Sequence, residues 1–133
     1  ASRNIYLKII YYYKLKMEST QSAITVLHDI SEFKDIISNE QTGNNLYIID
    51  FHANWCNPCK IFKQVLDEVI PEYKDRITFY KVDIDKEIDL ANIFQVRAIP
   101  HFVMISKSGG ISPGGGALNK ETLKYFLEGL LSK

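Results

Sequence analysis

The chain has 133 residues, 46% of them hydrophobic, which suits one domain with an apolar core and is too short for two of ordinary size. Its 16 basic and 16 acidic residues cancel, and no basic stripe in the body favours a nucleic-acid partner. No apolar stretch approaches the roughly 20 residues that span a bilayer.

In the predicted organisation, residues 1–20 are an N-terminal extension and residues 21–133 form one domain. The extension carries basic side chains and no acid before Glu18, its bases being Arg3, Lys8, Lys14 and Lys16. Its apolar residues recur near helical spacing, although residues 11–17 also alternate as an extended segment would. We favour a helix, and interpret it as a terminal arm or processing remnant rather than a docking segment for a partner.

Strand and helix patterns alternate through the body. In chain order they predict a strand at Ala23–Leu27, a helix at Glu32–Ser38, a buried strand at Leu46–His52, a helix from Cys56 or Pro58 to Tyr73, a strand at Ile77–Asp83, a short helix at Ile88–Phe94, strands at His101–Ser106 and Ile111–Gly115, and a helix near Lys120–Leu131. Asp29 with Glu32 suits a capping box, and Pro71 should end or bend the long helix. Pro113 confines the last strand to an edge or a bulge. This order predicts an α/β fold with a mixed sheet flanked by helices on both faces.

Both cysteines of the chain lie between Trp55 and Lys60, where a buried strand gives way to a helix. A Cys-x-x-Cys pair can close into a small disulfide ring, and free N–H groups at a helix N-terminus favour thiolate over thiol. Reversible thiol–disulfide exchange needs both features. The pattern therefore predicts a redox dithiol.

From about residue 23 to residue 131 the chain resembles a thioredoxin. The residues that carry the resemblance are Asp50-Phe51, Trp55-Cys56-Asn57-Pro58-Cys59-Lys60, Lys81 with Asp83, Ile99-Pro100 and Gly116-Ala117. The resemblance implies a thioredoxin fold and a protein-disulfide reductase that uses its own cysteine pair and no bound cofactor. It also implies protein disulfides as substrates and a separate reductase, similar to thioredoxin reductase, as electron donor.

The resemblance makes Cys56 the nucleophile and Cys59 the resolving thiol. We expect the Cys56 sulfur to be exposed before the helix and Cys59 to be screened within its first turn. It also places Asp50 beneath the pair as a proton relay with Lys81 as its partner. Burial at the end of an apolar strand would raise the pKa of Asp50, whereas a strand-end aspartate that faces solvent is the alternative.

A flat apolar patch around the thiols is the expected substrate surface. The residues assigned to it are Trp55, Asn57, Pro58, Ile84, Ile99, Pro100, Gly116 and Ala117. The resemblance makes Pro100 a cis-proline that faces the disulfide. The three glycines at residues 114–116 either let a substrate backbone come close or are only a flexible or bulged edge.

Two histidines near the motif depart from the family pattern. His52 replaces the usual aromatic residue after Asp50-Phe51, and His101 follows Pro100, where an imidazolium would favour the Cys56 thiolate. The two histidines and both cysteines also make a formal Cys₂His₂ set for zinc. We do not favour that site, because strand alternation should turn His52 away from the loop.

A binding role is the other alternative to catalysis. The same fold can act as a subunit of a larger complex, held by its N-terminal extension. A chain that begins at Ala1 with such an extension favours a processed organellar or secretory-pathway protein over a cytoplasmic one.

Overall fold

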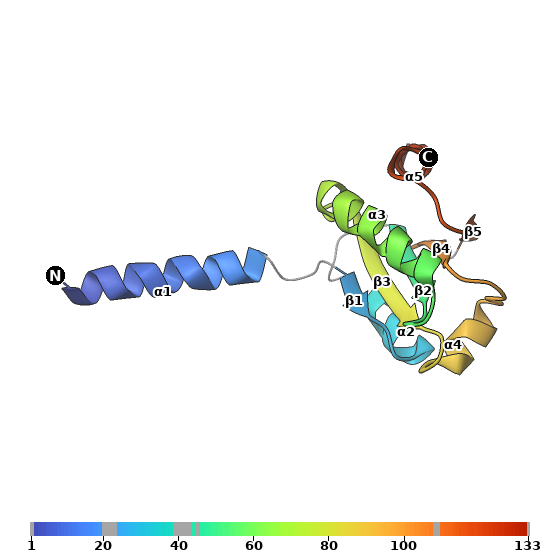
Figure 1. The fold of residues 1–133 in the computed structure, drawn as a ribbon, viewed down its shortest axis with the longest axis horizontal. Coiled ribbons are helices and arrows are strands. Elements are labelled where there is room, and N and C mark those ends of the chain that lie inside the picture. The colour runs from blue at the N-terminus through green and yellow to red at the C-terminus, as the bar shows by residue number, and fades with distance from the viewer. Residues whose placement is uncertain (1, 20–23, 39–43, 45, 108–109, 133) are drawn as a thin grey trace.

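The computed structural model describes residues 2–19, 24–38, 44, 46–107 and 110–132. Its helices and strands alternate along most of the chain (Figure 1). Their bounds are α1 Ser2–Ser19, β1 Ile24–Val26, α2 Ile30–Ser38, β2 Leu46–His52, α3 Asn57–Tyr73, β3 Ile77–Asp83, α4 Ile88–Ile93, β4 His101–Ser106, β5 Ile111–Gly115 and α5 Lys120–Leu131.

The strands form one sheet in the order β1-β3-β2-β4-β5. Strands β1, β3 and β2 run parallel, while β4 is antiparallel to β2 and β5 is antiparallel to β4. Strands β2 and β3 therefore lie inside the sheet, which accounts for their nearly continuous apolar sequences. The predicted α/β fold with a mixed sheet is confirmed.

Successive side chains of each strand point to opposite faces of the sheet and pack into two separate hydrophobic cores. One core packs β-sheet residues against α3 and α5, and includes Ile48, Phe79 and Phe102 with Phe62 and Leu123. The other packs the opposite face against α2 and α4, and includes Tyr47, Phe51 and Val82 with Phe33 and Leu90. The prediction of helices on both faces is confirmed, and Asp50 shares the parity of Leu46 and Ile48 on the α3 face.

Most predicted boundaries agree with the structure, and the differences have local causes. Helix α2 begins at Ile30 rather than at Glu32, because Asp29 Oδ1 accepts the Glu32 N–H at 2.7 Å. The Glu32 carboxylate in turn accepts the His28 N–H at 3.3 Å, completing a variant of the predicted capping box. Helix α3 ends shortly after Pro71, as expected. Ala23, the predicted first residue of β1, lies outside the described residues.

Strand β5 forms an edge of the sheet and, among the described strands, has β4 as its one neighbour. An edge strand tolerates Pro113, which has no N–H to donate to a further strand. The pairing with β4 shifts register between Phe102 and Val103, so the predicted edge and irregularity are both present. Gly114 is buried against the Phe102 ring, which would overlap any added Cβ. Gly115 has a φ of +99°, a conformation that favours glycine.

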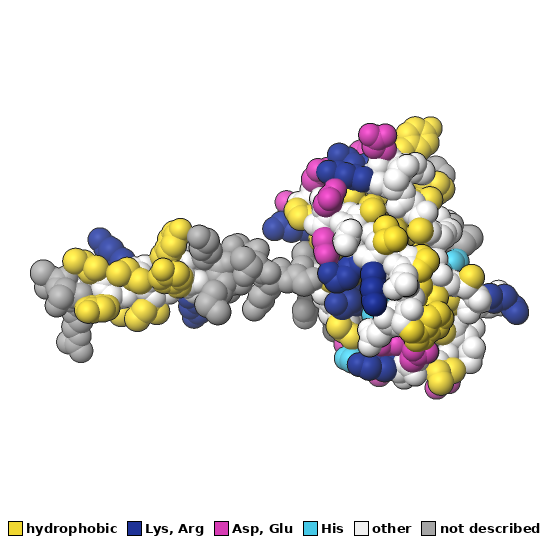
Figure 2. All heavy atoms as spheres, in the orientation of Figure 1, with side chains coloured by type: hydrophobic (Ala, Val, Ile, Leu, Met, Phe, Trp, Pro, Cys, Tyr) yellow, Lys and Arg dark blue, Asp and Glu magenta, His cyan; other side chains and the backbone are white. Residues whose placement is uncertain are grey.

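The N-terminal residues form a helix rather than the alternative extended segment. Helix α1 projects from the body, and the described side chains of residues 4–14 are exposed (Figure 1). Apolar side chains dominate its visible surface between scattered basic ones (Figure 2). Across the described ranges, no helix combines the length and apolar character needed to cross a bilayer.

Candidate active site

The cysteine pair lies where the chain leaves β2 and enters α3. Cys56 is the N-cap of α3, with extended backbone angles, and its Sγ accepts the Cys59 N–H at 3.2 Å. Pro58 lies in the first turn, where its missing N–H costs no helical hydrogen bond. Cys56 and Cys59 form a disulfide, with their Cα atoms 5.2 Å apart. The pair can therefore store two electrons at a helix N-terminus.

Both cysteines are buried, at 4% exposure for Cys56 and 5% for Cys59. They form a small cluster with Ala53, against which Ile84 and Ile99 pack. Cys59 is screened as expected, whereas the expectation that Cys56 is exposed is wrong for the disulfide form. The N-cap position, and not exposure, distinguishes the two sulfurs.

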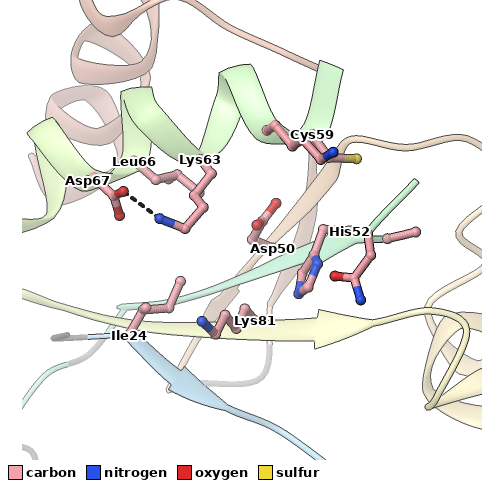
Figure 3. Close-up of a pocket in the computed structure, with 11 residues that line it drawn as sticks. Ile24, Asp50, His52, Cys59, Lys63, Leu66, Asp67 and Lys81 are labelled. Atoms are coloured by element: carbon pink, nitrogen blue, oxygen red, sulfur yellow. Dashed lines mark hydrogen bonds and ion pairs between the residues drawn. The ribbon is translucent and has the colours of Figure 1, made fainter. Parts of the chain in front are cut away.

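Asp50 projects from β2 toward α3, beneath the helix turn that holds Cys59 (Figure 3). The residue is 7% exposed, and its Oδ1 is buried without a hydrogen-bond partner. Burial raises its pKa from 3.8 to about 7, and the neighbouring Lys81 ammonium opposes part of that rise. The alternative of a solvent-facing aspartate is excluded.

Asp50 lines a hollow of about 350 Å³ in the surface of the protein. Its floor comes from the strands, and its roof from α3, where Lys63 Nζ and Asp67 Oδ2 form an ion pair at 2.7 Å (Figure 3). The residues around it are Ile24, Asp50, His52, Ala53, Asn54, Cys59, Lys60, Lys63, Leu66, Asp67 and Lys81. A buried carboxyl and one of the two cysteines thus share one hollow, which charged and apolar side chains line together.

His52 lines that hollow together with Asp50, so the prediction that strand alternation turns it away is wrong. The two residues are separated by one position in β2 and therefore lie on the same face. Burial lowers the pKa of His52, Asp83 opposes that change, and Lys81 and Lys86 add to it. The imidazole is therefore mainly neutral near neutral pH.

His101 does not supply the expected imidazolium. Its ring lies 6.3 Å from that of Phe51, and burial lowers its pKa. Within the described ranges, no group of three or more His, Cys, Asp or Glu side chains is arranged to hold a metal ion. The formal Cys₂His₂ set therefore has no metal-binding arrangement among these residues.

The residues assigned to the substrate surface differ in how far they are exposed around the cysteine pair. Trp55 is 66% exposed, and its Nε1 donates to Asp85 Oδ2 at 2.8 Å. Asn57, Pro58, Gly116 and Ala117 are exposed, whereas Ile84 and Ile99 are half-buried beside the cysteines. The Ile99–Pro100 bond is cis, as expected, and Pro100 is buried.

Asp85 and Lys63 were not anticipated from the sequence. Asp85 accepts the hydrogen bond that holds the exposed indole of Trp55. In the sequence, its position two residues after Asp83 was the one feature that could have pointed to it. Lys63 lies one helical turn beyond Cys59 and lines the hollow, which its spacing along α3 could have indicated.

The thioredoxin family model matches residues 24–129. Thioredoxin from Buchnera aphidicola is 33% identical over 104 residues, which cover 77% of this chain and 96% of that protein. Mitochondrial thioredoxin-3 from Saccharomyces cerevisiae is 36% identical over 90 residues, covering 68% of this chain and 67% of that protein. The crystal structure of the oxidised yeast protein matches with a TM-score of 0.67 and 35% identity, covering 80% of this chain and 98% of the other.

Proposed function

Because this chain belongs to the thioredoxin family, we propose that Cys56 is its attacking thiolate and Cys59 its resolving thiol. The protein is a thiol–disulfide oxidoreductase that acts on protein disulfides. Its redox-active group is the Cys56–Cys59 disulfide, and the family uses no bound cofactor. Residues 21–133 constitute the thioredoxin domain in this proposal, with residues 1–20 as an extension.

The N-cap position of Cys56 carries the assignment of roles. A thiolate there accepts the Cys59 N–H and faces the positive end of the α3 macrodipole. These interactions favour the thiolate form of Cys56 in the reduced protein. Cys59 lies inside the first turn, where its sulfur has no comparable set of N–H groups ahead of it.

The reaction proceeds in two exchanges. The Cys56 thiolate attacks a substrate disulfide, forming a mixed disulfide and releasing one substrate thiolate. Cys59 then loses its proton to the Asp50 carboxylate and attacks Cys56 Sγ, which expels the second substrate thiolate. Two electrons pass from the dithiol to the substrate, and the Cys56–Cys59 disulfide remains. The pKa of Asp50, at about 7, suits a group that accepts and returns a proton near neutral pH.

Trp55, Asn57, Pro58, Ile84, Ile99, Pro100, Gly116 and Ala117 form the proposed substrate surface. The exposed indole of Trp55 is held by Asp85 and so presents an apolar face at little entropic cost. Gly116 lies beside the Pro100 carbonyl, where the absence of a side chain leaves room for an extended substrate. A shallow surface of this kind admits many protein disulfides.

A separate reductase returns the Cys56–Cys59 disulfide to the dithiol. Relatives include mitochondrial thioredoxins from Bos taurus and Saccharomyces cerevisiae and a chloroplastic thioredoxin X from Arabidopsis thaliana. These relatives support an organellar location.

Helix α1 favours a second function as a docking element. Its exposed side chains include Ile5, Ile9 and Tyr12, which lie along one side of the helix. A partner that covers them would hold the domain in a larger complex. Pull-down with full-length protein, a deletion of residues 1–20 and Cys56→Ser separates the roles. Docking predicts capture that survives Cys56→Ser and fails in the deletion, and equal capture by the deletion contradicts it.

Turnover of a protein disulfide with excess dithiol as reductant tests the enzymatic proposal. Wild type and Cys56→Ser are compared at equal concentration. The proposal predicts turnover by wild type and a rate at the uncatalysed background for Cys56→Ser. Undiminished turnover by the variant would contradict the role of Cys56.

A further inference from the structure

The hollow beside Cys59 is lined by the carboxyl group of Asp50, which has little direct contact with bulk solvent. Asp50 is 7% exposed and its Oδ1 has no hydrogen-bond partner. A buried group that accepts a proton in each turnover must also release it to solvent, and Asp50 opens onto the hollow that it shares with His52 and Lys81. The hollow has a volume of about 350 Å³ and several polar side chains in its lining, so it has room for several water molecules.

His52 is the side chain in this hollow best suited to pass a proton between Asp50 and solvent. It follows Asp50 on the same face of β2, it is half-buried, and it lines the same space. The charged groups around it either act on its charge or line the same hollow. These are Asp50 on β2, Lys81 and Asp83 on β3, Lys86 after β3, and Lys60, Lys63 and Asp67 on α3.

The lysines cannot substitute for His52 in this role. A lysine ammonium offers donors and no acceptor, whereas neutral imidazole has one of each and can take up a proton on one nitrogen while releasing another. Lys63 is also held by Asp67 at 2.7 Å. Lys81 lies opposite Asp50 in the strand pairing and acts on it as a fixed positive charge.

We infer that His52 is a positioning residue that acts through Asp50, carrying its proton to and from solvent through the hollow. The inference rests on the proposed role of Asp50 as proton acceptor for Cys59. His52 stands where thioredoxins usually have an aromatic residue, so the inferred role is specific to this chain. The hollow is then the route by which the proton of Asp50 reaches solvent.

The proton and electrons balance without a further reactant. Cys59 gives its proton to Asp50, the Cys59–Cys56 bond forms, and the bond from Cys56 to the substrate breaks with its electron pair on the leaving thiolate. Asp50 then passes the proton through His52 to water in the hollow, which restores both the carboxylate and the neutral imidazole.

A chromogenic aromatic disulfide of nitrothiobenzoate isolates this step. Reduced protein releases one coloured thiolate when Cys56 attacks and a second when Cys59 resolves the mixed disulfide. Because this thiolate leaves without a proton, the proton from Cys59 must reach the solvent. Stopped-flow absorbance is recorded for wild type, His52→Ala, His52→Gln, Asp50→Asn and the control His28→Ala, each with and without added imidazole.

We expect His52→Ala to slow the second phase about tenfold near neutral pH, less than a full acid–base contribution because water in the hollow keeps a slower route. Added imidazole should restore most of that rate, since the hollow and the deleted ring leave space for it. The first phase and His28→Ala should be unaffected. His52→Gln, which keeps a polar side chain of similar size, should be slow and resist imidazole.

A His52→Gln variant that resolves at the wild-type rate would overturn the role of His52. So would a slow His52→Ala variant that imidazole fails to restore, because a purely structural defect behaves in that way. Asp50→Asn separates the two levels of the proposal. If Asp50→Asn resolves at the wild-type rate, the proton relay itself is wrong; if it is slow while His52→Ala is fast, only the inference about His52 fails.

Discussion

Asp50 and Lys81 are direct partners in the parallel pairing of β2 with β3, on the strands that lie inside the sheet. Burial disfavours the Asp50 carboxylate, and the Lys81 ammonium favours it, so that the pKa of Asp50 settles at about 7. The fold thus places a carboxyl that changes charge near neutral pH directly beneath the helix that holds the cysteines (Figure 3). That relationship connects sheet register to the proposed chemistry.

Replacing Lys81 should raise the pKa of Asp50 above about 7, because burial would then act without an opposing charge. The variant Lys81→Met keeps the length and apolar stem of the side chain. Carboxyl-carbon NMR across a pH titration measures the effect in the oxidised protein. Lys63→Met is the matched control, since its ammonium is bonded to Asp67. An equal pKa of Asp50 in wild type and Lys81→Met would show that Lys81 is not its electrostatic partner.

Stability should fall with rising pH because of Asp50. The unfolded chain releases this proton near its ordinary pKa of 3.8, while the folded protein holds it until about 7. The folded state therefore binds more protons between these values, and its free energy of unfolding decreases as pH rises through that window, levelling off above it. Asp50→Asn removes this loss, with a gain of up to about 4 kcal/mol above the window.

Urea unfolding of oxidised wild type and Asp50→Asn, at about pH 5 and about pH 8, checks that sign. The advantage of the Asn variant should be larger at the higher pH. An advantage that is equal at both, or larger under acidic conditions, would mean that Asp50 is not protonated in the folded protein as described.

Two glycine substitutions should have opposite effects on stability. Gly114→Ala places a Cβ into the Phe102 ring and should cost on the order of 1–3 kcal/mol. Gly129→Ala lies in α5, where nothing within 4 Å obstructs a Cβ, and should add about 0.5–1 kcal/mol through helix propensity. Thermal unfolding compares the pair, and a neutral Gly114→Ala would show that β5 yields at this edge.

Removing residues 1–20 should leave disulfide turnover unchanged. The described side chains of residues 4–14 are exposed, and α1 projects from the body rather than covering α3 (Figure 1). Turnover of the deletion variant and of the full chain, measured with the same substrate and dithiol, decides the matter. A deletion variant that stays folded by circular dichroism yet loses turnover would place α1 in the catalytic machinery.

Much of the fold is readable from local sequence. The bounds of β2 and β3 agree with the prediction because their runs of apolar residues are buried on both faces. The start of α2 was misplaced because Asp29, and not the apolar pattern, decides where that helix begins. For α1, tyrosine-rich spacing suits both helix and strand, and apolar periodicity alone could not separate them decisively.

The sequence predicts the site residues that belong to a motif, but not the features that depend on tertiary packing. The positions of Cys56, Cys59 and Asp50 follow from the motif and from burial of β2. The orientation of His52 follows from its spacing, because it shares a face of β2 with Asp50. The burial of Cys56 depends on the packing of Ile84 and Ile99 around it, which sequence spacing does not reveal. The bond from Trp55 to Asp85 likewise joins two loops.

The most direct test of the central claim is to trap the reaction after its first exchange. Cys59→Ser is mixed with a protein disulfide, and the adduct is digested without reductant and mapped by mass spectrometry, with Cys56→Ser as the matched control. The account predicts a stable mixed disulfide on Cys56 in the first variant and little adduct in the second. An adduct that forms only through Cys59, in the Cys56→Ser variant, would reverse the assignment of nucleophile and resolving thiol.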